Sequence, residues 1–368
     1  MPTRPHIARL TAHRVAISLA IAAATASVGC SDAAAPVAPP DHALLAANTD
    51  GPLAVESVLG LEPLIGAAVP TSIANDINDL GHVVGSSAAP GALHHAVLWD
   101  VNASVFPVDL GTLPGGTDSE ARAINSTGAV IVGLSDNANL ETRATRWVNV
   151  NGNWIIQDLG AFQGQTRAEA FDVADDGTIV GTWFPQPGMG VRTFIWQNGV
   201  LTDLHPSVIE RARGLNNSGQ VVGANSVNHA VIWTAAGGAM EIGTLGGNAS
   251  VAFDINASGE ITGTALTTSG VAHAFLWTPR KGMLDLGTLA GTTTSEGHAI
   301  NAAGQVVGQS MTSANERRGF LWAKGKMLDL GALPGHTESG AEAINNEKQV
   351  VGWSLSSGLT RATLWTIK

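Results

Sequence analysis

One motif recurs seven times along this chain and constrains its fold more than any other feature. A Val-Val-Gly-like triplet ends at seven glycines spaced 40 to 48 residues apart: Gly85, Gly133, Gly181, Gly223, Gly263, Gly308 and Gly352. A tryptophan follows each triplet: Trp99, Trp147, Trp196, Trp233, Trp277, Trp322 and Trp365. Self-similarity at a period of this size is the signature of a repeat architecture in which one supersecondary unit is copied.

Each unit predicts four short β-strands. The segment Ala299–Asn301 turns through Gly304 into Gln305–Gly308, and a loop with Asn at its start and Gly near its end is typical of a hairpin. A second hairpin joins His273–Trp277 to Met283–Gly287, and helical periodicity is absent throughout. Two units depart from the pattern. Unit seven has Lys348 at the turn glycine, and unit two has one extra residue before Gly133, which we interpret as a bulge.

Seven units of four strands predict an all-β fold, a seven-bladed β-propeller. A β-solenoid is the alternative, but solenoid coils are usually shorter and need atypical caps at both ends, which the sequence lacks. The last unit stops at Lys368 without its fourth strand, whereas Val58–Leu64 supplies an unpartnered strand of that type before unit one. We therefore expect the N-terminal strand to complete the last blade, which would remove a free sheet edge.

The first residues predict export. Residues 1–14 carry three arginines and no acid, and Val15–Val28 is an uncharged apolar run that is too short to cross a bilayer core of about 30 Å. Ser27-Val28-Gly29-Cys30 resembles a bacterial lipobox, in which the cysteine becomes the acylated N-terminus. The alternative is ordinary cleavage after Ala26, which would give a secreted protein with a free thiol.

These observations divide the chain into three parts. Residues 1–29 are predicted to be a lipoprotein signal peptide, residues 30–52 an Ala/Pro-rich tether, and residues 53–368 the seven-repeat propeller. Ser31 follows the cysteine where inner-membrane lipoproteins carry Asp, and this resemblance to lipoprotein sorting favours the outer membrane. Membrane contact is expected through the lipid anchor alone.

Composition excludes several classes of function. The 30 acidic residues outnumber the 19 Lys and Arg, which argues against nucleic-acid binding because that affinity rests on neutralised phosphates. A single cysteine excludes a disulfide framework and a cysteine-rich zinc site. The chain also lacks a Gly-rich phosphate loop, a nucleophile elbow and a zinc-binding His-Glu-x-x-His helix. We predict no cofactor and no metal.

A cation stands four residues before each repeat tryptophan, at His95, Arg143, Arg192, His229, His273, Arg318 and Arg361. In the second hairpin Asp285 lies diagonal to His273, within reach of a long side chain. The acidic residue of an Asp-Leu-Gly motif therefore predicts a structural pair with this cation in its own blade. A metal-binding ring is the weaker interpretation because arginine does not ligate metals.

The best candidate ligand site lies three and five residues before the repeat asparagine of each unit, such as Asn301. The residue between these two positions is always small, whereas the two positions vary and hold many of the scarce charges: Glu120, Arg122, Glu169, Arg211, Arg213, Glu296, His298 and Glu342. Equivalent positions in a ring share radius and height, so these side chains would gather at one mouth of the central channel. The alternative is that charges at strand ends simply meet water.

Other residues carry weaker hypotheses. Glu120, Glu169 and Glu296 would serve a hydrolase if they converged at a set separation. Asp76-Ile77-Asn78 and Asp172–Gly177 lack the ligand spacing of an EF-hand, so we interpret their carboxylates as turn residues. Trp183 and Trp353 lie outside the repeat position and either stack on a ligand from an exposed site or are buried between blades.

The repeated pattern, clearest at His273–Leu289 and Ala299–Gly308, resembles the HAF-repeat extracellular proteins over about residues 56–368. The family takes its name from His-Ala-Phe, present here at His273. The resemblance implies an exported bacterial repeat protein without an established activity, and it brings no catalytic residues. The prediction is therefore a non-catalytic binding module of the cell envelope, with a protein or polysaccharide ligand. The alternative is an envelope glycoside hydrolase or polysaccharide lyase that uses the channel carboxylates.

Overall fold

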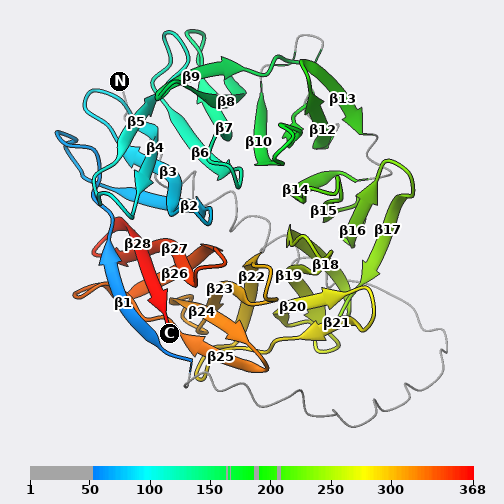
Figure 1. The fold of residues 1–368 in the computed structure, drawn as a ribbon. Coiled ribbons are helices and arrows are strands. Elements are labelled where there is room, and N and C mark those ends of the chain that lie inside the picture. The colour runs from blue at the N-terminus through cyan, green and yellow to red at the C-terminus, as the bar shows by residue number, and fades with distance from the viewer. Residues whose placement is uncertain (1–52, 163–164, 166, 186–189, 205–208) are drawn as a thin grey trace.

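The computed structural model describes residues 53–368 except 163–164, 166, 186–189 and 205–208. The predicted signal peptide, Cys30 and the tether lie outside the described residues. Seven four-stranded antiparallel sheets are arranged as blades in a ring (Figure 1). The seven-bladed β-propeller is confirmed, and the β-solenoid is wrong. Within the described part of the chain, no apolar helix reaches the length that crossing a bilayer requires.

The strands of each blade are given from the central axis outward. Blade 1 contains β2 (Ser72–Ile77), β3 (His82–Ala88), β4 (His94–Asp100) and β5 (Val108–Gly111). Blade 2 contains β6 (Ser119–Ile124), β7 (Val130–Asp136), β8 (Thr142–Val150) and β9 (Asn153–Asp158). Blade 3 contains β10 (Ala168–Val173), β11 (Ile179–Trp183), β12 (Arg192–Gln197) and β13 (Val200–Leu204).

The remaining blades repeat this order. Blade 4 contains β14 (Arg211–Leu215), β15 (Val221–Ala224), β16 (Ala230–Thr234) and β17 (Gly238–Gly243). Blade 5 contains β18 (Gly246–Ile255), β19 (Ile261–Thr267), β20 (Ala272–Thr278) and β21 (Gly282–Asp285). Blade 6 contains β22 (Thr294–Ile300), β23 (Val306–Met311), β24 (Arg317–Ala323) and β25 (Lys326–Asp329). Blade 7 contains β26 (Glu338–Ile344), β27 (Gln349–Ser356), β28 (Leu359–Ile367) and β1 (Val55–Gly60).

Blade 7 is completed by the N-terminal strand, as predicted. Strand β1 pairs antiparallel with β28, with Val58 opposite Trp365. It begins three residues before the predicted strand and ends at Gly60, so that Leu61 and Glu62 continue past the sheet. These two residues still fasten the ring, because the amide of Leu61 donates to Ala362 O and Trp99 of blade 1 donates to Glu62 O.

The alternating strand directions give the ring two different faces. Every inner strand begins on one face, here the start face, and ends at a hairpin turn on the opposite face, here the turn face. Strand β1 begins and β28 ends on the turn face, where the amide of Lys368 donates to Ala54 O at 3.0 Å. The described chain therefore enters and leaves the propeller on the turn face.

The repeat asparagines shape the turns of the turn face and also bond neighbouring blades to one another there. Asn345 Oδ1 accepts the amides of Glu347 and Gln349 in its own turn. Its Nδ2 donates to Asn78 O of blade 1 at 3.1 Å, across the junction between the last blade and the first. Equivalent bonds to the next blade start from four further side chains of this position: Asn78, Asn216, Asn256 and Asn301. The motif therefore links neighbouring blades around the ring.

The bulge predicted at the extra residue of unit two is wrong. The extra residue lengthens the turn, because the amide of Asn125 bonds to Val130 O, five residues on, whereas the equivalent Asn301 bonds to Gln305 O, four residues on. A register shift is instead present in the inner strand of every blade, three residues before the repeat asparagine. A regular bulge leaves the repeat spacing unchanged, so the spacing of motifs could not reveal it.

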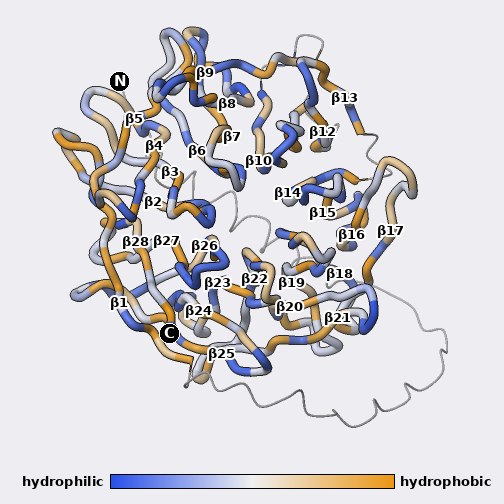
Figure 2. Tube along the Cα trace, viewed as in Figure 1, coloured by the Kyte–Doolittle hydropathy of each residue, from blue (hydrophilic) through white to orange (hydrophobic). Residues whose placement is uncertain are grey.

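The core lies between the blades. Trp99, Trp147 and Trp365 are fully buried, and the other repeat tryptophans are buried or nearly so. The small residue four before the repeat asparagine, such as Ala74 or Ala341, is also fully buried. Figure 2 shows hydrophobic residues along the strands and hydrophilic segments where β2, β6, β14 and β26 approach the axis. Polar chemistry is therefore concentrated around the centre of the ring.

Candidate functional site

The inner-strand bulge places one side chain from each blade around the axis. The bulged residues are Asn75, Arg122, Phe171, Arg213, Phe253, His298 and Glu342, here called the bulge ring. A bulge leaves its extra residue out of the ladder and re-aims its side chain, and bulges are enriched next to functional sites. The ring is polar or aromatic in all seven blades and lies two residues before the end of each inner strand.

Blades 2 and 3 are joined by an ion network. Glu169 has 2% of its surface exposed and receives Arg122 Nη1 and Arg167 Nη2, both at 2.8 Å. Arg122 also lies 3.7 Å from Glu120, whose carboxylate accepts Asn75 Nδ2 at 3.0 Å. Burial alone would lower the pKa of Arg122, but the charges of Glu169 and Glu120 raise it. A buried charge of this kind persists because it is paired and hydrogen-bonded.

Phe171 extends this network into blade 4. The guanidinium of Arg122 lies 4.5 Å from its ring centre, and that of Arg213 lies 4.4 Å away. The face of an aromatic ring attracts cations, so one phenylalanine holds arginines from both neighbouring blades. Arg211 Nη2 donates to Asn228 at 2.6 Å and lies 3.7 Å from Glu210. Blades 2 to 4 thus present a continuous group of arginines.

Blades 6 and 7 share a different cluster, centred on His298. Its Nδ1 lies 2.9 Å from Ala341 O and 3.3 Å from Glu342, and its Nε2 lies 3.6 Å from Glu296. Gln309 donates to Glu296 at 2.9 Å, and Trp353 donates to Glu342 at 3.1 Å. All three titratable side chains are at most 7% exposed. Phe253 of blade 5 contacts His298 edge-on, with ring centres 6.1 Å apart.

The eight predicted ligand-binding residues lie around the axis in separate groups, two or four residues before the ends of the inner strands. Glu120 and Glu169 share Arg122, whereas Glu296 is bound within blade 6. Arg211 and Arg213 stand on blade 4. Within the described residues, no three His, Asp, Glu or Cys side chains are grouped so as to hold a metal ion.

Sequence reasoning missed a second set of carboxylates, each of which follows a bulge-ring residue by one position. Asp76, Asp172 and Asp254 lie in inner strands, so the assignment of the first two to turns is wrong. Each accepts a backbone amide from the next blade: Ile124 at 2.9 Å, Leu215 at 2.6 Å and Ile300 at 2.8 Å. The signal was available, because Asp alternates with Ala or Gly at this position in successive units.

Burial changes the ionisation of two of these carboxyls. Burial raises the pKa of Asp172 well above its usual value, and the charges of Asp254 and Asp76 add to this increase. Burial also raises the pKa of Asp254 to about 6. The backbone amides that both groups accept oppose the shift without cancelling it. The carboxylates therefore tie blades together at an electrostatic cost.

The predicted pairs of cation and blade carboxylate are confirmed in all seven blades. They are His95 with Asp109 at 2.9 Å, Arg143 with Asp158 at 3.0 Å, Arg192 with Asp203, His229 with Glu241 at 2.9 Å, His273 with Asp285 at 2.9 Å, Arg318 with Asp329 at 3.5 Å, and Arg361 with Glu62 at 2.6 Å. The last pair takes its acid from the N-terminal segment. These cations belong to the framework of each blade.

The two tryptophans outside the repeat are buried. Trp183 is 8% exposed and stacks on Phe162 with ring centres 4.9 Å apart. Trp353 is 6% exposed. Neither presents a free aromatic surface, so burial between blades is the correct alternative.

Comparison with known proteins extends to the fold only. No family model and no curated protein matches the chain. Among solved structures, the propeller domain of the Trilobed protease from Pyrococcus furiosus, described as having an open velcro topology, is similar with a TM-score of 0.56 at 10% identity over 82% of this chain and 97% of that one. The resemblance is one of architecture. In the present chain, by contrast, β1 closes the last blade.

Two further structures show the same likeness. An oligogalacturonate lyase from Vibrio parahaemolyticus gives a TM-score of 0.52 at 11% identity, over 86% of this chain and 98% of that one. A prolyl endopeptidase gives 0.53 at 12% identity over 82% of this chain, which spans 50% of the endopeptidase. Propellers with different activities thus share this scaffold, and the site must supply the argument for function.

Proposed function

We propose that this protein is a lipid-anchored binding module of the bacterial cell envelope, which recognises a protein or polysaccharide ligand through the bulge ring. The supporting observation is that the framework of the blades is constant, whereas the residues of the bulge ring vary. The cation and carboxylate pairs recur in all seven blades, whereas the bulged residue changes chemistry from blade to blade. A scaffold that repeats its framework in every blade and varies one side chain per blade near the axis is suited to recognising a ligand.

The carboxylates of the ring favour binding over catalysis. Glu169 is held by Arg122 and Arg167, and Glu296 by Gln309. A glycoside hydrolase needs two carboxyl groups that flank one bond, about 5 to 10 Å apart. Here the glutamates of blades 2 and 3 serve a network distinct from that of blade 6. The envelope hydrolase or lyase remains the alternative that a turnover assay must address.

The placement of the chain ends suits an anchored receptor. The described chain enters β1 on the turn face, beside Lys368. The bulge ring lies around the axis, two residues before the end of each inner strand. A lipid on Cys30 would tether the turn face to the membrane and leave the start face open to a ligand.

The anchoring part of the proposal is tested by labelling cells with radioactive palmitate. The wild-type protein is expected to incorporate label and to sediment with the outer membrane. Cys30→Ala is expected to lose both the label and the sedimentation. Unlabelled protein in the culture medium would show secretion instead.

The binding part is tested with the full chain purified from membranes in detergent. Purified peptidoglycan sacculi and an outer-membrane extract serve as probes, and bound material is analysed by mass spectrometry. Glu120→Gln, Glu169→Gln and Glu296→Gln are each assayed for retention and for release of soluble sugar. Retention without release by the wild type supports a binding module. Release that any one substitution abolishes would establish the enzyme.

A further inference from the structure

Six cations, which include all five lysines of the chain, gather on one part of the turn face. They come from the hairpin between β20 and β21, the hairpin between β24 and β25, the inner turn of blade 7 and the end of β28. Figure 1 shows the two hairpins and the C-terminus along one part of the perimeter. This group is here called the cationic arc: Arg280, Lys281, Lys324, Lys326, Lys348 and Lys368.

The charges of the cationic arc are not used within the fold. Arginines of the strands form the framework pairs, such as Arg143 with Asp158 and Arg361 with Glu62. Among the residues that the structure describes, no member of the arc takes part in an ion pair. Five members are exposed, and Lys348 is half-buried. Their charges are therefore available to a partner outside the molecule.

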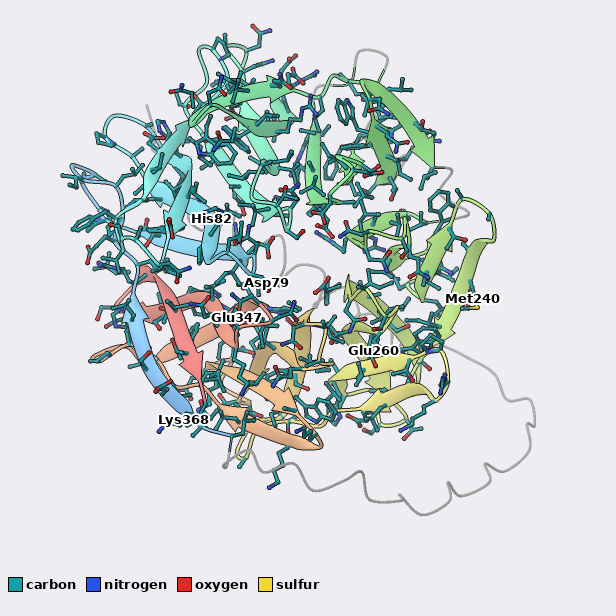
Figure 3. The ribbon with its side chains drawn as sticks, viewed as in Figure 1. Asp79, His82, Met240, Glu260, Glu347 and Lys368 are labelled. Carbon is teal, nitrogen blue, oxygen red and sulfur yellow. The ribbon has the colours of Figure 1, made fainter. Side chains whose placement is uncertain are left out.

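The rest of the turn face lacks this positive charge. The outer hairpins of blades 1 to 4 contain no Lys or Arg: residues 101–107, 151–152, 198–199 and 235–237. Asp79, Asp175 and Asp176 are exposed at the inner turns of blades 1 and 3. Figure 3 shows Asp79 near the axis and Lys368 at the perimeter. The turn face is therefore acidic near the axis and basic along the margin of blades 5 to 7.

Acidic groups of the same three blades reduce the charge of the cationic arc without cancelling it. Glu260 and Glu347 belong to inner turns, and Glu260 accepts Asn256 Nδ2 at 2.8 Å. Glu56 lies near the start of β1, and the terminal carboxylate belongs to Lys368. On the outer margin, five cations thus face two anions, which leaves an excess of three positive charges on a chain whose net charge is −11.

The cationic arc has the chemistry that suits a bilayer surface. Lysine carries a compact, hydrated charge on a flexible stem, whereas arginine supplies the rigid fork that recognises one particular anion. Lysine is also depleted from protein interfaces. Cations that are spread over three blades match a plane of phosphate headgroups, where each cation is attracted by the negative surface potential.

We propose that the cationic arc docks against the surface of an anionic phospholipid bilayer. The propeller contacts the membrane with the margin of blades 5 to 7, because repulsion holds the acidic inner turns of blades 1 and 3 away from it. The described chain enters on the same face, where Ala54 O accepts the amide of Lys368 at 3.0 Å. This contact adds to the predicted lipid anchor, and it requires neither a lipid on Cys30 nor the proposed ligand.

The test measures co-sedimentation of the protein with lipid vesicles. The full chain carries Cys30→Ala, so that no acyl chain contributes. One set of vesicles is pure phosphatidylcholine, and the other mixes it with anionic phosphatidylglycerol. In about 0.1 M salt we expect binding to the mixed vesicles alone. That binding should be lost in about 1 M salt, because the Debye length falls from about 10 Å to about 3 Å.

Paired substitutions assign the binding to the cationic arc. Lys281→Gln combined with Lys326→Gln should weaken vesicle binding more than about tenfold, because each cation near an anionic surface contributes about fivefold. Arg280→Gln combined with Lys324→Gln is an independent second pair. Lys281→Arg combined with Lys326→Arg keeps the charge and should bind as before.

A further control removes one positive charge from the other side of blade 6. Arg318→Gln lies near the start-face end of β24, where the arginine side chain is 49% exposed, and should not change vesicle binding. Equal binding to the two sets of vesicles, or unchanged binding by both neutralised pairs, would overturn the inference. Displacement by glycerol phosphate at constant ionic strength would also overturn it, because the ligand would then be a phosphate group in solution.

The proposed function is measured separately. Because that ligand is expected to meet the bulge ring, the neutralised pairs should retain sacculi or outer-membrane material as the unsubstituted chain does. If they lose this retention together with vesicle binding, the cationic arc belongs to the ligand site and membrane docking is rejected. If vesicles bind and neither ligand probe does, membrane docking stands and the binding module falls.

Discussion

At the scale of single residues, the glycine of the Val-Val-Gly motif is explained by the inner-strand bulge. A Cβ built on any of these seven glycines would lie 1.9 to 2.3 Å from a backbone carbonyl oxygen of the inner strand. That carbonyl belongs to the residue five before the repeat asparagine, such as Glu296 facing Gly308. The motif that reveals the repeat thus marks the place where the bulge brings two backbones together.

Gly308→Ala is expected to destabilise the protein by about 3 kcal/mol, the upper part of the range for overpacking, because a backbone oxygen 1.9 Å from the new Cβ must shift. The loss is measured by urea unfolding followed by tryptophan fluorescence. Gly60→Ala is the control, because its nearest neighbour would be a side-chain atom at 3.4 Å. Equal stability of Gly308→Ala and wild type would show that the approach is relieved elsewhere.

Among the seven equivalent turn positions, only that of Lys348 is not occupied by glycine, and the backbone of this lysine is strained. Its φ is 61°, in the left-handed region that the six equivalent glycines occupy. Lys348→Gly should stabilise the protein by up to about 1 kcal/mol, because relief of the left-handed conformation exceeds the added freedom of the unfolded chain. The midpoint of urea unfolding should rise. A lower midpoint would mean that the lysine side chain makes a compensating contact.

At the scale of elements, the inner strand and its turn join neighbouring blades. The repeat asparagine bonds its own turn and the following blade, and the inner-strand aspartates bond the next inner strand. Sequence alone predicted the strands, the turn and the framework pairs, because all of these are local to one unit. It could not predict the contacts between units, such as Arg122 with Glu169, whose partners are set by the bulge and by the spacing of the blades.

Asn345→Ala is expected to cost about 2 to 4 kcal/mol. It removes the acceptor of two turn amides and the bond to Asn78 O across the closing junction. Each amide left unpaired in a buried position costs about 1 to 3 kcal/mol. Glu347→Ala in the same turn is the control and should cost under about 1 kcal/mol, because that side chain is exposed. Thermal unfolding compares the two. A smaller loss for Asn345→Ala would show that the other bonds across the junction, such as that of Asn346 with Asp79, keep the ring closed.

At the scale of the whole molecule, the ring concentrates its electrostatic cost near the axis. Asp172 and Asp254 have pKa values raised by burial, so the folded protein binds more protons than the unfolded chain between about pH 4 and the folded pKa. Their contribution to stability is therefore greatest at low pH and falls as the pH rises through the folded pKa of each group, which for Asp254 is about 6. This is opposite to the ordinary behaviour of a salt-bridged carboxylate.

The free energy of unfolding should accordingly decrease between pH 5 and pH 7.5, with about 1 kcal/mol of the loss coming from Asp254. Asp254→Asn should reduce this slope whatever its effect on absolute stability. The quantity to measure is the urea midpoint at several pH values in the same buffer mixture. An unchanged slope in Asp254→Asn would assign the titration to another group.

Both ends of the propeller lie in blade 7, and this affects the order in which the blades can follow one another along the chain. Ala54 and Lys368 are joined by a backbone hydrogen bond, so a short linker between them would need to span almost no distance. A ring of equivalent blades has no intrinsic first member. A circular permutant opened at the exposed turn of Lys324 and Gly325, with the old ends joined, should fold to the same ring. The seam would then move to blade 6, and the position of the chain ends could be chosen independently of the order of the blades.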